Sequence, residues 1–181
     1  MDTKVLILPG LGNSGPQHWQ SLWEAANPAL RRVAQRDWDH PELQDWVAGL
    51  DAAVAQAGPG AVLVAHSLAC LQVAHWAHTS SRPVRGALLV AVPDPSADAY
   101  PVEAASFAPV PLQRLPFPSI VVASDDDPIG PLAHAQRCAD AWGSRLVCIG
   151  AAGHINAASN LGEWPEGLAL LGSLSQLPSV M

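Results

Sequence analysis

Five short apolar runs recur along the chain, and they constrain its fold more than any other feature. Each has five to seven residues, most are rich in β-branched side chains, and they lie at 4–8, 61–65, 86–92, 119–124 and 144–149. Runs of this length, apolar nearly throughout, are typical of strands buried on both faces of a sheet. We therefore expect all five to be fully buried strands.

Helix-like stretches separate most of these runs, at 41–56, 68–79 and 130–142, and another at 162–176 carries Pro165 in its first turn. Strands that alternate with helices predict a parallel sheet with helices on both faces. A weaker run at 31–36 is expected to pair at one side of the sheet. The prediction is α/β, with about six mostly parallel strands.

Composition narrows the class of protein further. A length of 181 residues fits one domain, which we expect to span 1–181. The net charge is −7 and no basic stripe is present, so we expect no nucleic-acid partner. The apolar runs are far shorter than the roughly 20 residues that cross a bilayer, and the opening run is too short for a signal peptide. We expect a cytoplasmic protein with no membrane partner.

The three cysteines, Cys70, Cys138 and Cys148, have apolar neighbours and wide spacing. We expect them to be buried, with no disulfide and no cysteine-bound metal. The segment 93–118 contains seven prolines and little periodicity. Two interpretations stay open for it: a long surface loop, or a minimal cap over the edge of the sheet.

Ser67 stands where the second apolar run meets a helix, at the carboxyl end of a predicted strand. Ligands of doubly wound sheets bind at that edge. The surrounding Ala65-His66-Ser67-Leu68-Ala69 matches the nucleophile elbow G-x-S-x-G with alanine in place of both glycines. The elbow needs small residues at those two places because its turn is strained and closely packed. Ser67 is therefore the candidate nucleophile.

An acyl-transfer site also needs hydrogen-bond donors for the developing oxyanion. The backbone N–H of Leu68, at the start of the following helix, is one candidate. The glycine-rich loop 9–15 offers the N–H of Leu11 as the second. The same loop lacks the ending of a P-loop and the spacing of a dinucleotide-binding motif.

Two further strand ends supply the other groups of a triad. Asp125, Asp126 and Asp127 follow the run at 119–124, and His154 lies in the loop after 144–149. We expect the aspartates on the strand two places beyond that of Ser67. The chain order Ser, Asp, His is that of α/β-hydrolases. The order does not choose among the three aspartates. Such a triad needs no metal and no organic cofactor.

The chain resembles the small serine hydrolases related to retinoblastoma-binding protein 9 and YdeN, in the α/β-hydrolase superfamily. The resemblance rests on PGLGNSGPQHWQSLWE, VAHSLACL, the S-x-x-D-P run from Ser124 to Pro128, GAAGHINA and the Trp164-Pro165-Glu166-Gly167 segment. It implies a single-domain α/β-hydrolase fold and a carboxylesterase-like activity. It also implies that the triad acid is the aspartate before proline, Asp127.

Four other side chains are candidates for substrate contact. His18 and Trp19 either line the acyl pocket or anchor the first helix. His66 is expected to pack beside the site, and Asp94 either contacts substrate or forms a turn with its flanking prolines. His75 and His78 have the spacing of a metal pair, but no third ligand is nearby in the sequence, so we expect no metal site.

These features predict a serine hydrolase that cleaves a small or medium ester, with a small-molecule ester or acyl compound as its substrate. Since there is little sequence for a lid, we expect short acyl groups to be preferred. Two alternatives stay open: a serine peptidase or amidase, and a catalytically weak hydrolase fold that acts as a protein-binding module.

Overall fold

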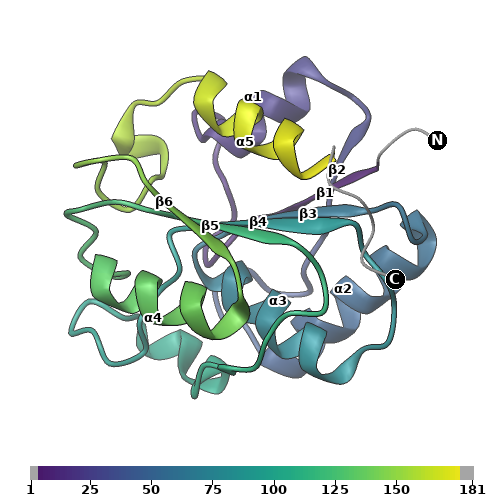
Figure 1. Cartoon of the computed structure of the whole chain (residues 1–181), viewed down its shortest axis with the longest axis horizontal. Coiled ribbons are helices and arrows are strands. Elements are labelled where there is room, and N and C mark those ends of the chain that lie inside the picture. The colour runs from purple at the N-terminus through teal and green to yellow at the C-terminus, as the bar shows by residue number, and fades with distance from the viewer. Residues whose placement is uncertain (1–3, 176–181) are drawn as a thin grey trace.

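A six-stranded parallel sheet forms the centre of the protein. The structure is a computed structural model and describes residues 4–175. The strands follow the order β2-β1-β3-β4-β5-β6, and every neighbouring pair is parallel (Figure 1). The strands are β1 (Val5–Leu8), β2 (Leu30–Arg32), β3 (Val62–His66), β4 (Gly86–Val90), β5 (Ser119–Ala123) and β6 (Arg145–Cys148).

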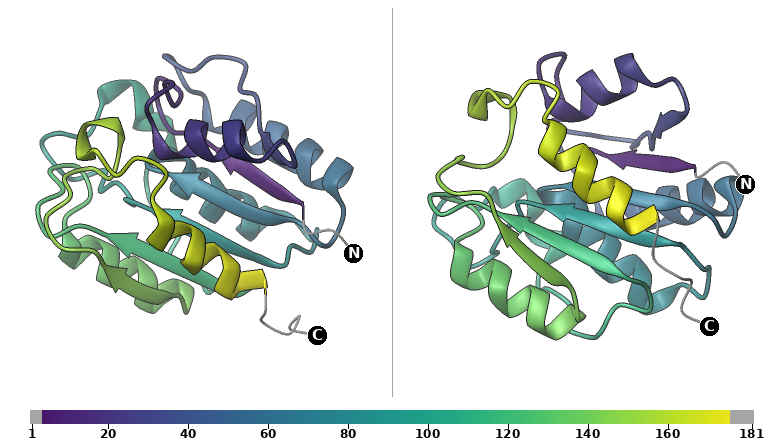
Figure 2. Two further views of the ribbon diagram at one scale, coloured as in Figure 1. Left: turned by 90° about the horizontal axis from the view of Figure 1, so that it is seen from above. Right: turned by 45° about the horizontal axis from the view of Figure 1, so that its top comes forward.

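Helices cover both faces of this sheet. One face carries α1 (Trp19–Ala26) and α5 (Pro165–Ser175), and the other carries α2 (Leu43–Ala57), α3 (Leu68–Thr79) and α4 (Leu132–Trp142) (Figures 1 and 2). Two short 3₁₀ helices, η1 (Val102–Phe107) and η2 (Ala157–Ser159), complete the order. The predicted α/β fold is confirmed.

Two apolar cores hold the three layers together. On the α1/α5 face, Trp19, Trp23 and Trp164 pack against residues of the central strands. On the other face, Trp46 and Trp76 belong to the larger core, which contains side chains from α2, α3 and α4. The alternation of inward positions along each strand sends neighbouring residues to opposite cores, so the central strands are apolar throughout.

Most helices and strands lie where the sequence predicts them, and the predictions differ from the structure at the two edge strands. The edge strand β2 is short, Leu30–Arg32, and ends before most of the predicted run 31–36. The other edge strand, β6, was predicted to be fully buried, and this is wrong: Arg145 and Cys148 are exposed. An edge strand has a neighbour on one side only, so its side chains stay near solvent. Of the predicted last helix, Gln176 lies outside the described residues.

The cysteines divide in the same way. Cys70 and Cys138 are buried as expected, whereas the expectation for Cys148 is wrong because it lies on the exposed edge strand. All three thiols are free. Among residues 4–175, no helix has both the length and the apolar character needed to cross a membrane.

Candidate active site

Ser67 sits in a strained turn between β3 and α3. Its backbone has φ 54° and ψ −124°, a conformation that costs a non-glycine residue about 1–3 kcal/mol. Hydrogen bonds on both sides hold it: the Ser67 N–H donates to the Val90 carbonyl at 2.9 Å, and the Ser67 carbonyl accepts from the Cys70 N–H at 2.8 Å. This turn lifts the hydroxyl to the carboxyl edge of the sheet.

The turn is also closely packed, which explains why small residues surround it. Ala65 and Ala69 are fully buried. Gly10, in the loop after β1, passes so near that a Cβ there would lie 2.9 Å from the His66 carbonyl oxygen and 3.0 Å from Ser67 Cβ. The alanines at the two elbow positions therefore fit, and Gly10 is the position where the backbone approach requires glycine.

Ser67, His154 and Asp127 form one chain of hydrogen bonds. The Ser67 Oγ lies 2.7 Å from His154 Nε2, and His154 Nδ1 lies 2.8 Å from Asp127 Oδ2. They lie beyond the carboxyl ends of β3, β5 and β6. In the sheet, β5 and β6 are neighbours, and β4 separates β5 from β3. The structure thus brings together the three side chains that the sequence had singled out.

The Asp127 carboxylate is held in its charged form. Its Oδ1 accepts hydrogen bonds from the backbone N–H groups of Ile129 at 2.9 Å and Gly130 at 3.0 Å. Burial by itself raises the pKa of Asp127, but the hydrogen bond and charge of His154 and these two N–H donors outweigh it, and the net pKa is lowered. A negative charge is therefore available beside the His154 ring.

The two neighbouring aspartates have different roles from that of Asp127. Asp126 Oδ1 accepts from Ser124 Oγ at 2.8 Å and from the Gly153 N–H at 2.7 Å, so it holds the loop that carries His154. Asp125 is exposed and accepts from the Cys148 thiol at 3.0 Å. Sequence reasoning missed this structural role of Ser124 and Asp126.

His66 supports the same loop from the other side. Its Nε2 lies 2.9 Å from the His154 carbonyl oxygen, and since a carbonyl only accepts, Nε2 carries the proton. Burial, with the neighbouring His18 and His154 adding to it, holds the pKa of His66 well below its usual value. His66 is thus a neutral donor that fixes the backbone of His154.

A cavity of about 210 Å³ opens beside the Ser67 hydroxyl. It is bordered by Leu11, Asn13, His18, His66, Ser67, Leu68, Pro93, Tyr100, Pro101, Ile129, His154 and Asn156. The N–H groups of Leu11 and Leu68 donate to no other residue within 4–175. Of the predicted contact residues, Leu11, Leu68, His18 and His66 therefore lie at the cavity.

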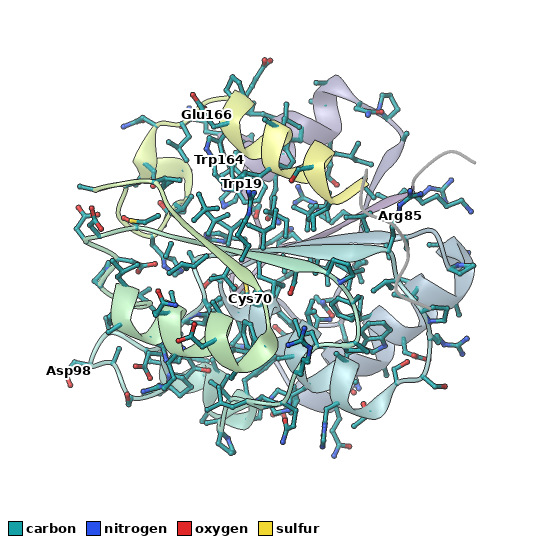
Figure 3. All side chains as sticks on the ribbon, viewed as in Figure 1. Trp19, Cys70, Arg85, Asp98, Trp164 and Glu166 are labelled. Carbon is teal, nitrogen blue, oxygen red and sulfur yellow. The ribbon has the colours of Figure 1, made fainter. Side chains whose placement is uncertain are left out.

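Trp19 and Asp94 do not border this cavity. Trp19 lies on the α1/α5 face near Trp164 (Figure 3), and its indole N–H donates to the Ile155 carbonyl at 2.9 Å. Asp94 turns the chain by accepting from the Ser96 N–H at 2.9 Å, and its other oxygen faces His134 at 3.3 Å. These contacts favour a structural role for both residues: Trp19 anchors the first helix, and Asp94 forms a turn.

Part of the proline-rich segment covers the cavity. Pro93, Tyr100 and Pro101 belong to its wall, and the Tyr100 hydroxyl donates to the Ala104 carbonyl at 3.0 Å. Figure 3 labels Asp98, which lies in the same segment. Burial raises the pKa of Tyr100 to about 12, so its phenol stays neutral. The sequence indicated a surface loop or a cap, but it carried no signal for which residues reach the site.

A larger hollow of about 690 Å³ lies between α2 and α3 and contains none of the triad residues. His75 borders it, and its Nε2 donates to the Phe107 carbonyl at 2.9 Å. The described part of the chain contains no group of three or more His, Cys, Asp or Glu side chains arranged to hold a metal ion.

Six parallel strands, helices on both faces and a serine at the turn after β3 define the class of protein as an α/β-hydrolase. A family model described as serine hydrolase matches residues 5–173, and the chain belongs to this family. Curated protein sequences provide no match.

Solved structures agree with this family. A YdeN-like hydrolase from Pectobacterium atrosepticum is 32% identical, with a TM-score of 0.86 over 96% of this chain and 90% of that one. The ydeN gene product of B. subtilis is 20% identical, with a TM-score of 0.80 over 96% and 98%. A thermophilic esterase from Thermogutta terrifontis is 17% identical, with a TM-score of 0.65 over 94% and 88%. The two less similar structures share the fold.

Proposed function

We propose that this serine hydrolase cleaves small carboxylic esters through a covalent acyl-enzyme, with Ser67 as nucleophile, His154 as general base and acid, and Asp127 as the triad acid. The observation that carries the proposal is the continuous hydrogen-bonded chain from Ser67 Oγ through His154 to Asp127, with contacts of 2.7 and 2.8 Å. These lengths suit proton transfer from the hydroxyl to the imidazole.

The reaction follows from these positions in two halves. His154 Nε2 takes the Ser67 proton as Oγ attacks the ester carbonyl carbon, and Asp127 stabilises the resulting imidazolium. His154 then gives that proton to the leaving alcohol oxygen as the carbon–oxygen bond breaks. In the second half, water attacks the acyl group by the same route and releases the acid, which restores the Ser67 hydroxyl.

The backbone N–H groups of Leu11 and Leu68 are the donors proposed for the negative oxygen of each tetrahedral intermediate. Both residues border the cavity, and neither N–H is used elsewhere in the described chain. Leu68 is also the first residue of α3, where the helix dipole favours negative charge. Removal of one such donor in other hydrolases costs about 10²–10³ in kcat.

The cavity supports a preference for short acyl groups. Its volume of about 210 Å³ lies below the roughly 300–1,000 Å³ typical of sites for drug-sized ligands. The test is hydrolysis of nitrophenyl esters of increasing acyl length by the purified full chain. We expect kcat/KM to peak at short chains and fall for long ones.

Rapid mixing tests the mechanism itself. A burst of nitrophenol equal to the enzyme concentration indicates an acyl-enzyme. Ser67→Ala should abolish it, whereas Ser173→Ala, in the remote helix α5, should leave it unchanged. Turnover that survives Ser67→Ala would contradict the mechanism, and faster turnover of matched aminoacyl amides than of esters would favour a peptidase.

A further inference from the structure

The imidazole of His18 has a defined proton position. His18 caps α1, and its Nδ1 accepts a hydrogen bond from the Gln20 N–H at 3.2 Å. A backbone N–H can only donate, so Nδ1 carries the lone pair. Burial, reinforced by the positive charge of Arg32 and by His154, lowers the pKa of His18 to about 4. The ring is therefore neutral at pH 7, with its proton on Nε2.

This Nε2–H has no acceptor in the described chain. Only 5% of His18 is exposed, and Nε2 itself is buried without a hydrogen-bond partner among residues 4–175. Arg85 Nε is the other buried side-chain atom of this kind in that range, and Arg85 stands just before β4, at the opposite edge of the sheet from Ser67. Buried polar groups without partners are rare because the lost water is not replaced.

The ring of His66 does not supply the missing acceptor. It stands nearly perpendicular to the His18 ring, with centroids 4.7 Å apart. His66 Nδ1 carries a lone pair, but His18 Nε2 has no hydrogen-bond partner within residues 4–175, so the two rings are in contact without a hydrogen bond between them. The donor is therefore left for a molecule that enters the cavity, which His18 helps to border.

Other side chains of the cavity wall are also donors. The amide oxygen of Asn13 accepts from the Ser14 N–H and from Arg32, and that of Asn156 accepts from the Ala158 N–H. Both amide NH₂ groups are left without a protein acceptor in the described chain. No Asp, Glu, Lys or Arg side chain borders the cavity. Among the side-chain nitrogens that line the cavity within the described residues, His66 Nδ1 is the one that can still accept a hydrogen bond.

We propose that His18 determines substrate specificity by donating a hydrogen bond from Nε2 to a second oxygen of the substrate, on the acyl chain beside the reacting carbonyl. The proposal rests on the esterase function above. His18 is a buried residue of the cavity wall, and the acyl group is the part of the substrate that stays on the enzyme while the alcohol departs. The substrate class is an ester of a short oxygenated acid, such as an alkoxy, hydroxy or keto acid.

Two substitutions test the roles of the two ring nitrogens separately. His18→Asn keeps an acceptor where Nδ1 stands, so it preserves the helix cap to Gln20, but it has no donor at Nε2. His18→Gln places an amide NH₂ near the Nε2 position and loses the cap. The substrates are nitrophenyl butyrate and nitrophenyl methoxyacetate, whose acyl chains have the same length and differ by one oxygen in place of a methylene.

The measurement is the ratio of kcat/KM for methoxyacetate to that for butyrate, compared between enzymes so that the intrinsic reactivity of the esters cancels. We expect His18→Asn to lower this ratio about fivefold, which is the effect on kcat/KM expected from the loss of one neutral hydrogen bond. His18→Gln should keep the ratio within about twofold of the wild type while its Tm falls. Thermal unfolding of both variants checks that each is folded.

An unchanged ratio in His18→Asn would overturn the proposal. The ratio stays unchanged when both esters lose activity equally, which would assign His18 to the carbonyl or to folding. A fall of the ratio in His18→Gln equal to that in His18→Asn would also overturn the proposal. These results differ from failure of the esterase function, in which the wild type turns over neither ester or its turnover survives Ser67→Ala.

Discussion

Replacing Asp127 by asparagine tests the hydrogen bond at the centre of the proposed mechanism. The Ile129 and Gly130 N–H groups both donate to Asp127 Oδ1, so the amide oxygen of the variant must take that position. The amide NH₂ then takes the place of Oδ2, which lies 2.8 Å from His154 Nδ1, while the amide oxygen stays 2.9 Å from the same nitrogen. A proton on Nδ1 would face this NH₂ group at 2.8 Å, donor against donor, so Nδ1 becomes the acceptor for the NH₂ group and the proton moves to Nε2.

A histidine protonated at Nε2 cannot accept the Ser67 proton. The equivalent change of tautomer lowers kcat about 10⁴-fold in a serine protease, which corresponds to about 5 kcal/mol of transition-state stabilisation. We expect a loss of this size for Asp127→Asn, with little change in Tm because the two backbone donors keep their acceptor. Steady-state hydrolysis of a short nitrophenyl ester measures it.

Asp125→Asn and Asp126→Asn are matched controls, because each also removes one carboxylate from the same turn. The asparagine at 126 keeps the oxygen that accepts from Ser124 and Gly153, and the Asp125 side chain accepts from the thiol of Cys148 on the exposed edge strand. Both should retain kcat within a few-fold of the wild type. A loss below tenfold in Asp127→Asn, or an equal loss in either control, would refute the assignment of the triad acid.

Three other predictions concern packing, the His154 loop and pH. Gly10→Ala should lower the unfolding free energy by about 1–3 kcal/mol and lower kcat, because its Cβ would meet Ser67 Cβ at 3.0 Å. Denaturant titration measures the change in stability, and Gly15→Ala, with open space around it, is the control. Asp126→Ala should lower kcat about tenfold by releasing the Gly153 N–H, and Asp126→Asn should restore it. The neutral buried His18 titrates at about 4 in the folded chain and near 6.5 in the unfolded chain, so the unfolded chain binds more protons below pH 6.5. The unfolding free energy should therefore fall between pH 7.5 and 5.5, by about 1 kcal/mol from this residue, and a flat profile would contradict the burial of neutral histidine.

The strand ends were readable from the sequence because the apolar runs stop directly before polar residues. Ser67 follows β3 at once, and the aspartates begin two residues after β5. Parallel strands bring their carboxyl ends to one edge, so the sequence alone assigns residues far apart in the chain to one site. The choice of Asp127 needed family resemblance, since all three aspartates share that edge.

The directions of individual side chains could not be predicted. His18 and Trp19 are adjacent, yet His18 borders the cavity while Trp19 packs into the core on the α1/α5 face. Which of the two side chains faces the cavity depends on where α1 begins and on the hydrogen bond from Trp19 to Ile155, which is more than a hundred residues away in the chain. The exposure of β6 likewise depends on its place at the edge of the sheet, which no local pattern shows.

Labelling with a fluorophosphonate probe tests the central claim most directly, because the probe reacts with a serine only when its hydroxyl is activated. Intact-mass spectrometry of the full chain, followed by peptide mapping, gives both the number of adducts and the residue modified. The account predicts one adduct per wild-type chain, on Ser67, and none in Ser67→Ala. An unlabelled wild type, or labelling that persists in Ser67→Ala, would contradict it.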